Sequence, residues 1–318
     1  MRTMVVNVDD IMNEFNYGIS SPEAIKAFLS AAYSNWKTAP LYVVLAGDGS
    51  ADYKNYLGFD RSLVPSRMVP TDYGLAVSDN YLADFNGDHI PEMAIGRLPV
   101  ADADELQTVI DKIKAHESSL GRSDAILAAD MPDSGGDFMT DSENLVDYFP
   151  AGFAIHRIYL GDLSASTVTE KRTELVGDLN NGTAFLNYVG HGGPDVLSDG
   201  LLSVDDVPSL TNAAALPTMT AMTCIAGNFS DPYADVLSES LLLAPGGGMA
   251  GVWAASGLSD DTQAGILDRE FYNAVFSGGH TVFGDTVLQA LSVYKQQGTI
   301  PYMMDIYNIL GDPALRLR

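Results

Sequence analysis

Cysteine is nearly absent from this chain of 318 residues, in which Cys224 stands alone. A single thiol forms no intrachain disulfide, and it excludes a structural zinc site that uses two or more cysteines. Apolar runs of about 18 residues, the length of a membrane-spanning helix, are also absent, so we expect no membrane insertion. The first residues lack the apolar segment of a secretory signal, and an early predicted strand favours a domain cut from a longer precursor.

Basic residues are scarce as well, because 17 Lys and Arg stand against 42 Asp and Glu, giving a formal charge of −25. Such a surface repels phosphate backbones, so nucleic acid is not an expected partner. It suits basic peptide substrates or Ca²⁺, although an ordinary solvated surface accounts for most of the charge. The chain also lacks Gly-x-Gly-x-x-Gly and Walker loops, which argues against a nucleotide-binding enzyme.

Short β-branched runs alternate with helical patterns along the whole chain. Strands are predicted at residues 5–8, 41–46, 93–96, 125–129, 154–159, 184–189, 218–222 and 248–254. Helices are predicted at residues 22–33, 103–117, 142–148, 167–179, 235–243, 263–276 and 282–295. This alternation predicts an α/β protein whose mostly parallel sheets are flanked by helices. A boundary near residue 120 is predicted to separate an N-terminal α/β subdomain, residues 1–120, from a C-terminal subdomain, residues 121–318.

Two of the predicted strands lead into loops that carry chemically reactive side chains. His191 follows one strand and lies between Gly190 and Gly192, and Cys224 follows the next strand. Functional groups gather at the carboxyl ends of parallel strands, and consecutive strands are usually neighbours. A Cys–His pair is the minimal apparatus for covalent acyl transfer, because the imidazole favours the thiolate that attacks. A lone cysteine is nevertheless more often a small buried residue, so residue types alone leave both interpretations open.

Four motifs are spread over nearly the whole chain. They are Asn-Gly-Asp-His-Ile-Pro-Glu-Met-Ala-Ile-Gly-Arg at residues 86–97, Asn-Tyr-Val-Gly-His-Gly-Gly at 187–193, Ala-Met-Thr-Cys-Ile-Ala-Gly-Asn-Phe at 221–229 and Tyr-Asn-Ile-Leu-Gly-Asp-Pro-Ala-Leu at 307–315. In this order they resemble the gingipain family of cysteine peptidases. The resemblance implies a caspase-like fold of two side-by-side subdomains, with the Cys–His dyad in the second.

The resemblance also implies an activity, namely cleavage of protein or peptide substrates through a thioester acyl-enzyme. Cys224 is then the nucleophile and His191 its base, and the main-chain N–H groups of Gly192 and Cys224 bind the oxyanion. The chemistry needs no cofactor. The family further implies a secreted or cell-surface bacterial protein.

Acidic residues near the dyad are the next candidates. By its strand position Asp130 matches an acid of the family and is predicted to orient His191, or else simply to cap a turn. Gingipains read a basic P1 residue with acids in the same half, and Asp133, Asp137 and Asp141 lie in one predicted loop. Asp141, with Asp137 as a further candidate, is predicted to bind Arg or Lys, although acids in an exposed loop are usually only solvated. Trp253 is predicted either as a pocket wall or as core filler of a buried strand.

Asp84, Asn86 and Asp88 alternate around a glycine turn, a pattern of oxygen side chains that can bind Ca²⁺. A structural Ca²⁺ ion, with Glu92 or Asp79 completing its ligands, and a plain Asx turn are the two interpretations. Two other functions remain open for the whole chain. One is a sortase-like transpeptidase of a bacterial secretion system, and the other is a non-catalytic caspase-like module that binds peptides.

Overall fold

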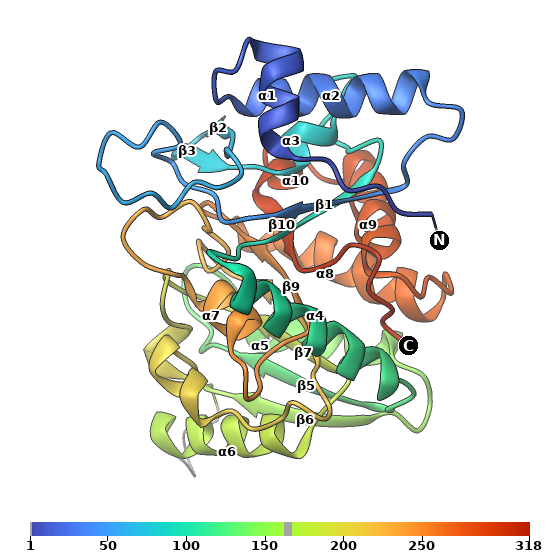
Figure 1. Cartoon of the computed structure of the whole chain (residues 1–318). Coiled ribbons are helices and arrows are strands. Elements are labelled where there is room, and N and C mark those ends of the chain that lie inside the picture. Colours follow the sequence, from blue (N-terminus) through green and yellow to red (C-terminus); the bar gives the residue numbers. More distant parts are fainter. Residues whose placement is uncertain (1, 162–166) are drawn as a thin grey trace.

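The computed structural model describes residues 2–161 and 167–318 and is built around one eight-stranded sheet (Figure 1). The strand order is β1-β4-β10-β9-β8-β7-β5-β6. Its strands are β1 (Tyr42–Ala46), β4 (Ala94–Leu98), β5 (Asp124–Ala129), β6 (Ala154–Tyr159), β7 (Phe185–Val189), β8 (Thr218–Met222), β9 (Gly251–Ala255) and β10 (Tyr307–Leu310). All pairings are parallel except that of β10 with β9, so the predicted α/β class with a mostly parallel sheet is confirmed.

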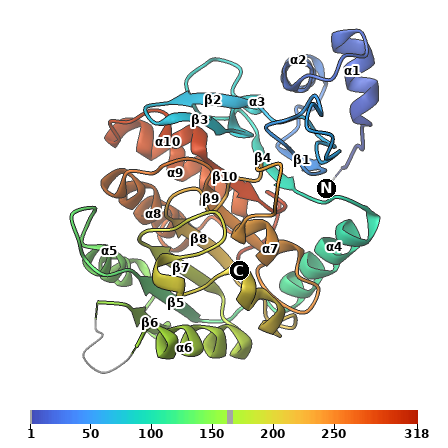
Figure 2. The same cartoon turned by 90° about the vertical axis from the view of Figure 1, so that its left-hand side faces the viewer.

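Helices cover both faces of the sheet, as Figure 2 shows edge-on. One face packs against α5 (Phe138–Asn144), α8 (Asp261–Phe276) and α9 (Phe283–Gln297). The other packs against α4 (Ala103–Ser118), α6 (Val168–Asn181) and α7 (Leu237–Leu243). Within β5, Leu127 contributes to the first core and Ile126 to the second, because successive strand residues point to opposite faces. A strand buried on both faces therefore reads as a continuous apolar run.

A smaller core lies at the β1 edge of the sheet. There α1 (Val8–Asn16), α2 (Pro22–Asn35) and α3 (Asn80–Ala83) pack against β1 and β4. The remaining elements are the hairpin β2 (Met68–Thr71) and β3 (Gly74–Val77), α10 (Met303–Ile306), and the 3-10 helices η1 (Val146–Tyr148), η2 (Ser198–Gly200) and η3 (Val204–Ser209). In the part of the chain that is described, every helix is too short or too polar to cross a membrane.

Two local predictions are wrong, and three short strands were missed. Residues 5–8 form no strand: Val5 is 93% exposed, and α1 begins at Val8 behind the N-cap Asn7. Residues 142–148 belong to two elements, α5 and η1, since α5 begins earlier behind its N-cap Asp137. The hairpin β2–β3 and strand β10 were not predicted, because four-residue strands carry too little alternation to stand out.

Strand β10 connects parts of the chain that are far apart in the sequence. It pairs with β9 on one side and, at Leu310 and Arg97, with β4 on the other, so the sheet is continuous. Helix α9 also packs against β4. The last residues of the chain thus complete the sheet next to strands from its first hundred residues. The division at residue 120 stays a prediction.

Candidate active site

His191 and Cys224 lie at the same edge of the sheet because β7 and β8 are neighbours in register. Val189, the last residue of β7, pairs with Met222, the last residue of β8. Each candidate follows its strand by two residues, and the Gly190 amide still donates to the Met222 carbonyl at 3.2 Å. The His191 side chain is 55% exposed and Cys224 is partly buried. No hydrogen bond joins Sγ to the imidazole among the described residues, and such contacts commonly tighten only when substrate binds.

The main chain after Cys224 is held in a strained turn. Ile225 has a φ of 47°, which a β-branched residue rarely adopts, and the Ala226 amide donates to the Cys224 carbonyl at 2.6 Å. The Ile225 amide donates to the Gly257 carbonyl, and the Ser259 amide points at Cys224 Sγ at 3.4 Å. Strained main chain persists only where its surroundings enforce it, and it concentrates at functional sites.

Two amide N–H groups beside the thiol are available to a ligand. Those of Gly192 and Cys224 donate to no acceptor within residues 2–161 and 167–318, whereas the Gly193 amide donates to the Val196 carbonyl. A Cβ at position 192 would lie 2.5 Å from Thr223 Oγ1, so the two loops approach this closely only with glycine there. The predicted oxyanion donors are thus adjacent and unoccupied by protein acceptors.

The His191 ring contacts Asp133, a residue that the sequence places only in an acidic loop. Its Nε2 lies 3.0 Å from Asp133 Oδ2, and its ring meets the Phe138 ring edge-on at 5.1 Å. The Gly135 amide, donating at 2.6 Å, and then His191 itself hold the pKa of Asp133 below its usual value. This pair fixes the imidazole on one side and leaves Nδ1 for other contacts.

Asp130 contacts His191 differently from the prediction. Its Oδ2 accepts the main-chain N–H of His191 at 3.2 Å, and its Oδ1 accepts that of Met131 at 2.6 Å. The carboxylate is buried and holds the loop rather than the ring. The predicted orienting contact is therefore corrected from the imidazole to the main chain.

The two predicted P1-binding acids have different surroundings. Asp137 caps α5 by accepting from the Thr140 amide at 3.2 Å and from its hydroxyl at 2.8 Å. Asp141 instead lies close to Asp261, the first residue of α8, and near the charge of Arg269.

Asp261 was not predicted, because in the sequence it looks like an ordinary acidic residue of a helix start. Burial and then the charge of Asp141 raise its pKa to about 6, and burial raises that of Asp141. Asp261 also interacts with the charge of His191. The main chain of Gly136 passes so close that a Cβ there would lie 2.2 Å from Asp261 Oδ2.

Residues 1–318 match the family model of peptidase family C25. The chain belongs to this family. It is 25% identical to gingipain R2 of Porphyromonas gingivalis, over the whole chain and 42% of that protein. It is 23% identical to Lys-gingipain of the same organism, over 91% of this chain and 16% of that protein. The chain thus spans less than half the length of these curated relatives.

Solved structures show the same fold. The Arg-specific cysteine proteinase gingipain R (RgpB) matches with a TM-score of 0.77 at 20% identity, covering 98% of this chain and 75% of that chain. A complex of the P. gingivalis RgpB pro- and mature domains matches with the same TM-score, covering 96% of this chain and 72% of that chain. The caspase-like fold expected from the four motifs is therefore confirmed.

Trp253 lies in the core of this C25 domain. Its indole is fully buried, stacks on Phe271 with centroids 5.6 Å apart, and donates from Nε1 to the Tyr307 carbonyl at 3.2 Å. An indole without exposed surface forms no pocket wall, so core packing is the interpretation that fits.

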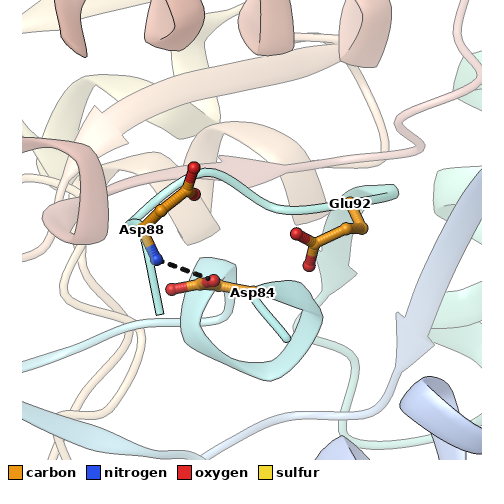
Figure 3. Close-up of side chains that lie close together, drawn as sticks. All are labelled: Asp84, Asp88 and Glu92. Carbon is orange, nitrogen blue, oxygen red and sulfur yellow. Dashed lines mark hydrogen bonds between the residues drawn. The ribbon is translucent and has the colours of Figure 1, made fainter. Parts of the chain in front are cut away.

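The predicted calcium loop brings together Asp84, Asp88 and Glu92, one of the two residues expected to complete the site, but Asn86 is not part of the group. Figure 3 shows Asp84, Asp88 and Glu92, whose carboxylates offer oxygens within 4.8 Å of one another. Asn86 instead turns its side-chain amide toward Glu92. Asp84 accepts main-chain N–H groups of residues 87, 88 and 89, as in an Asx turn. Asp79, the other candidate ligand, is taken up by Arg97.

Proposed function

We propose that this chain is the catalytic domain of a cysteine endopeptidase that cleaves after Arg or Lys. The observation that carries the proposal is the meeting of His191, Cys224 and two unoccupied amide donors at one sheet edge in a C25-family domain. The relatives include Arg- and Lys-gingipains. The proposed specificity is supported by the paired acids Asp141 and Asp261 beside the site.

The proposed reaction uses Cys224 as nucleophile and His191 as acid and base. Sγ gives its proton to the imidazole and attacks the peptide carbonyl carbon, forming a C–S bond and an oxyanion next to the amides of Gly192 and Cys224. Collapse breaks the C–N bond, and His191 returns the proton to the leaving amine. Water, deprotonated by His191, then hydrolyses the thioester and restores the thiol.

The P1 contact is proposed to form at the Asp141–Asp261 pair. Two carboxyl groups that face each other in a partly buried place repel once both ionise, and this repulsion contributes to the raised pKa of Asp261. A guanidinium or ammonium group of the substrate, placed between the two carboxylates, offsets the repulsion between them and forms charge-assisted hydrogen bonds to both.

The test is intact-mass labelling with a peptidyl-arginine chloromethylketone. We expect one adduct on wild-type protein, none on Cys224→Ala, and strong slowing in His191→Ala. His156→Ala is the matched control, because His156 is similarly exposed, pairs with Asp178, and lies on the edge strand β6, which β5 separates from β7. Labelling by iodoacetamide but not by the arginyl reagent would reject the P1 assignment alone. A thiol that reacts only after denaturation would reject the peptidase in favour of the non-catalytic module.

Product analysis separates hydrolysis from the transpeptidase alternative. With a peptide substrate and an added amine, a hydrolase releases chiefly the free acid. An amide product formed in preference to the acid would identify a transpeptidase.

We also propose a structural Ca²⁺ ion bound by Asp84, Asp88 and Glu92. Carboxylate oxygens are the ligands that this ion prefers, and their proximity supports the site. Ca²⁺ is expected to raise the thermal midpoint and Mg²⁺ to raise it less, with Glu92→Gln removing the difference. If both ions change the thermal midpoint equally in wild type and variant, the Ca²⁺ site is rejected and the loop is a plain Asx turn.

Secretion or cell-surface display is proposed from the family alone. The matched relatives are bacterial and much longer than this chain, which supports a multidomain precursor. Immunodetection in culture supernatant, membrane and cytoplasmic fractions tests both points, since it reports location and mass together.

A further inference from the structure

A polar cluster lies buried beneath the proposed active site, where apolar side chains would be expected. Its members, Asn187, Thr220, Asp268 and Tyr272, are each at most 2% exposed. Asn187 Nδ2 lies 2.9 and 2.8 Å from the two carboxylate oxygens of Asp268 and 2.9 Å from Thr220 Oγ1. Thr220 Oγ1 is in turn 3.0 Å from the Tyr272 hydroxyl.

This cluster links β7 and β8, the two strands that lead to the dyad, at paired positions of the sheet. Asn187 of β7 and Thr220 of β8 are partners in the sheet register. Each lies four residues before its catalytic candidate, His191 on β7 and Cys224 on β8. Asp268, on α8, accepts from the Asn187 side-chain amide, which also donates to Thr220, so one amide group links α8 to both strands.

The cluster is also connected to the proposed P1 acids. Helix α8 carries Asp261 at its first position and Asp268 two turns later, on the same side of the helix. Asp268 interacts with the charges of Arg269 and Asp141. A shift of α8 against the strands would therefore move Asp261 as well.

Burying this carboxyl group has an energetic cost. Burial raises the pKa of Asp268 to about 7, although Asn187 and other groups lower it in part. Asn187 Oδ1 has no hydrogen-bond partner among the described residues. An apolar group of the same shape would usually be at least as stabilising. Because hydrogen bonds are directional and apolar contacts are not, hydrogen bonds fix the position of the joined helix and strands along one another.

We propose that Asp268 is a positioning residue that, through Asn187 and Thr220, sets His191 at its working distance from Cys224. This inference rests on the proposed function, because it assigns a role to residues that support the same dyad. It predicts that loss of the cluster lowers the reactivity of Cys224 in protein that is still folded.

The experiment measures the rate of Cys224 alkylation by iodoacetamide across pH 5–9, which needs no substrate. Asp268→Ala and Asn187→Ala are each expected to slow alkylation near neutral pH by about tenfold to hundredfold, since misplacement of about 1 Å has such effects. Their profiles should approach that of His191→Ala, and the double variant should be no slower than either single one. Asp268→Asn, which keeps an acceptor for Asn187 Nδ2, should stay within about threefold of wild type.

Folding is measured in parallel by urea unfolding, and Thr220→Val serves as a milder variant should Asp268→Ala not fold. A folded Asp268→Ala or Thr220→Val that is less stable but alkylates with the wild-type rate and pH profile would overturn the inference and leave a structural role. The proposed function fails by a different outcome, namely wild-type alkylation that does not depend on His191.

Discussion

Two charged clusters at this sheet differ in how completely their groups are paired. Around Arg97, Nε and Nη2 each lie 2.8 Å from an oxygen of Asp79, and Nη1 donates to the carbonyls of Gly47 and Val64. Arg97 is fully buried. Around His191, by contrast, one ring nitrogen pairs with Asp133, and more than half of the side chain is exposed.

The difference separates groups that hold the fold from groups that are free to react. The Arg97 guanidinium is buried and makes four hydrogen bonds within the protein, so it holds the fold, and removing its carboxylate partner leaves an uncompensated charge. A half-paired imidazole, and an Asp261 carboxyl group whose pKa is raised by burial and by Asp141, can still gain a partner from a substrate. Substitutions in the two clusters should therefore affect different measurements.

The largest expected effect is on catalysis. His191→Ala should lower kcat/KM for an arginyl peptide by about 10²- to 10⁴-fold, the usual contribution of a general acid–base. Its free energy of unfolding should stay within about 0.5 kcal/mol of wild type, because the side chain is largely exposed. Urea unfolding and steady-state kinetics on the same preparation check both; equal losses in His156→Ala would contradict the assignment.

The converse is expected at Arg97. Arg97→Met should lower the free energy of unfolding by about 3–5 kcal/mol, because Asp79 remains buried without its partner. Arg97→Met with Asp79→Leu should recover part of this loss in urea unfolding. A loss below about 1 kcal/mol in the single variant would mean that the pair is not the stabilising unit described here.

Asp268 gives a pH dependence of stability with a defined sign. Its pKa rises from 3.8 to about 7 on folding, so between these values the folded state holds a proton that the unfolded state has released. Stability therefore falls as pH rises through this window, by an amount on the order of a few kcal/mol. Asp268→Asn should flatten the slope in urea unfolding between pH 4 and 7; an unchanged slope would assign it to other groups.

Asp261 should make cleavage after Arg depend on pH. With its pKa raised to about 6, it is mostly protonated at pH 5 and ionised at pH 7, so attraction of the P1 cation increases over this range. We expect kcat/KM for an arginyl peptide to rise about tenfold, and Asp261→Asn to remove this part of the rise. The same profile measured with a P1 norleucine peptide is the control for titration of other groups.

The smallest effect is expected at Asp133. Asp133→Asn keeps an oxygen for the ring but removes the charge, and both partners are about half exposed, so solvent already screens the pair. A decrease in kcat of about two- to fivefold is expected, with KM unchanged. Stopped assays at saturating substrate measure this, and a hundredfold decrease would instead place Asp133 in the core of the mechanism.

The dyad was predictable because each of its members follows a predicted strand and because the motifs at 187–193 and 221–229 resemble those of the gingipain family. The contacts that support the dyad were not predictable from the sequence. Asp133, Asp130 and Asp141 stand in one short acidic segment, and nothing in their order tells which reaches the ring, the main chain or Asp261. Their roles depend on loop conformation, which follows from contacts with distant residues such as Gly136 against Asp261.

By itself, the sequence determined the α/β class, most of the strands and the edge at which His191 and Cys224 meet. These follow from local patterns, since apolar runs define strands and consecutive parallel strands present their carboxyl ends together. Only the tertiary structure decided that β10 closes the sheet between β9 and β4, and that Asp268 lies under both catalytic strands. Asp268 comes 81 residues after Asn187, and a hydrogen bond across such a separation depends on how α8 packs, which no local pattern records.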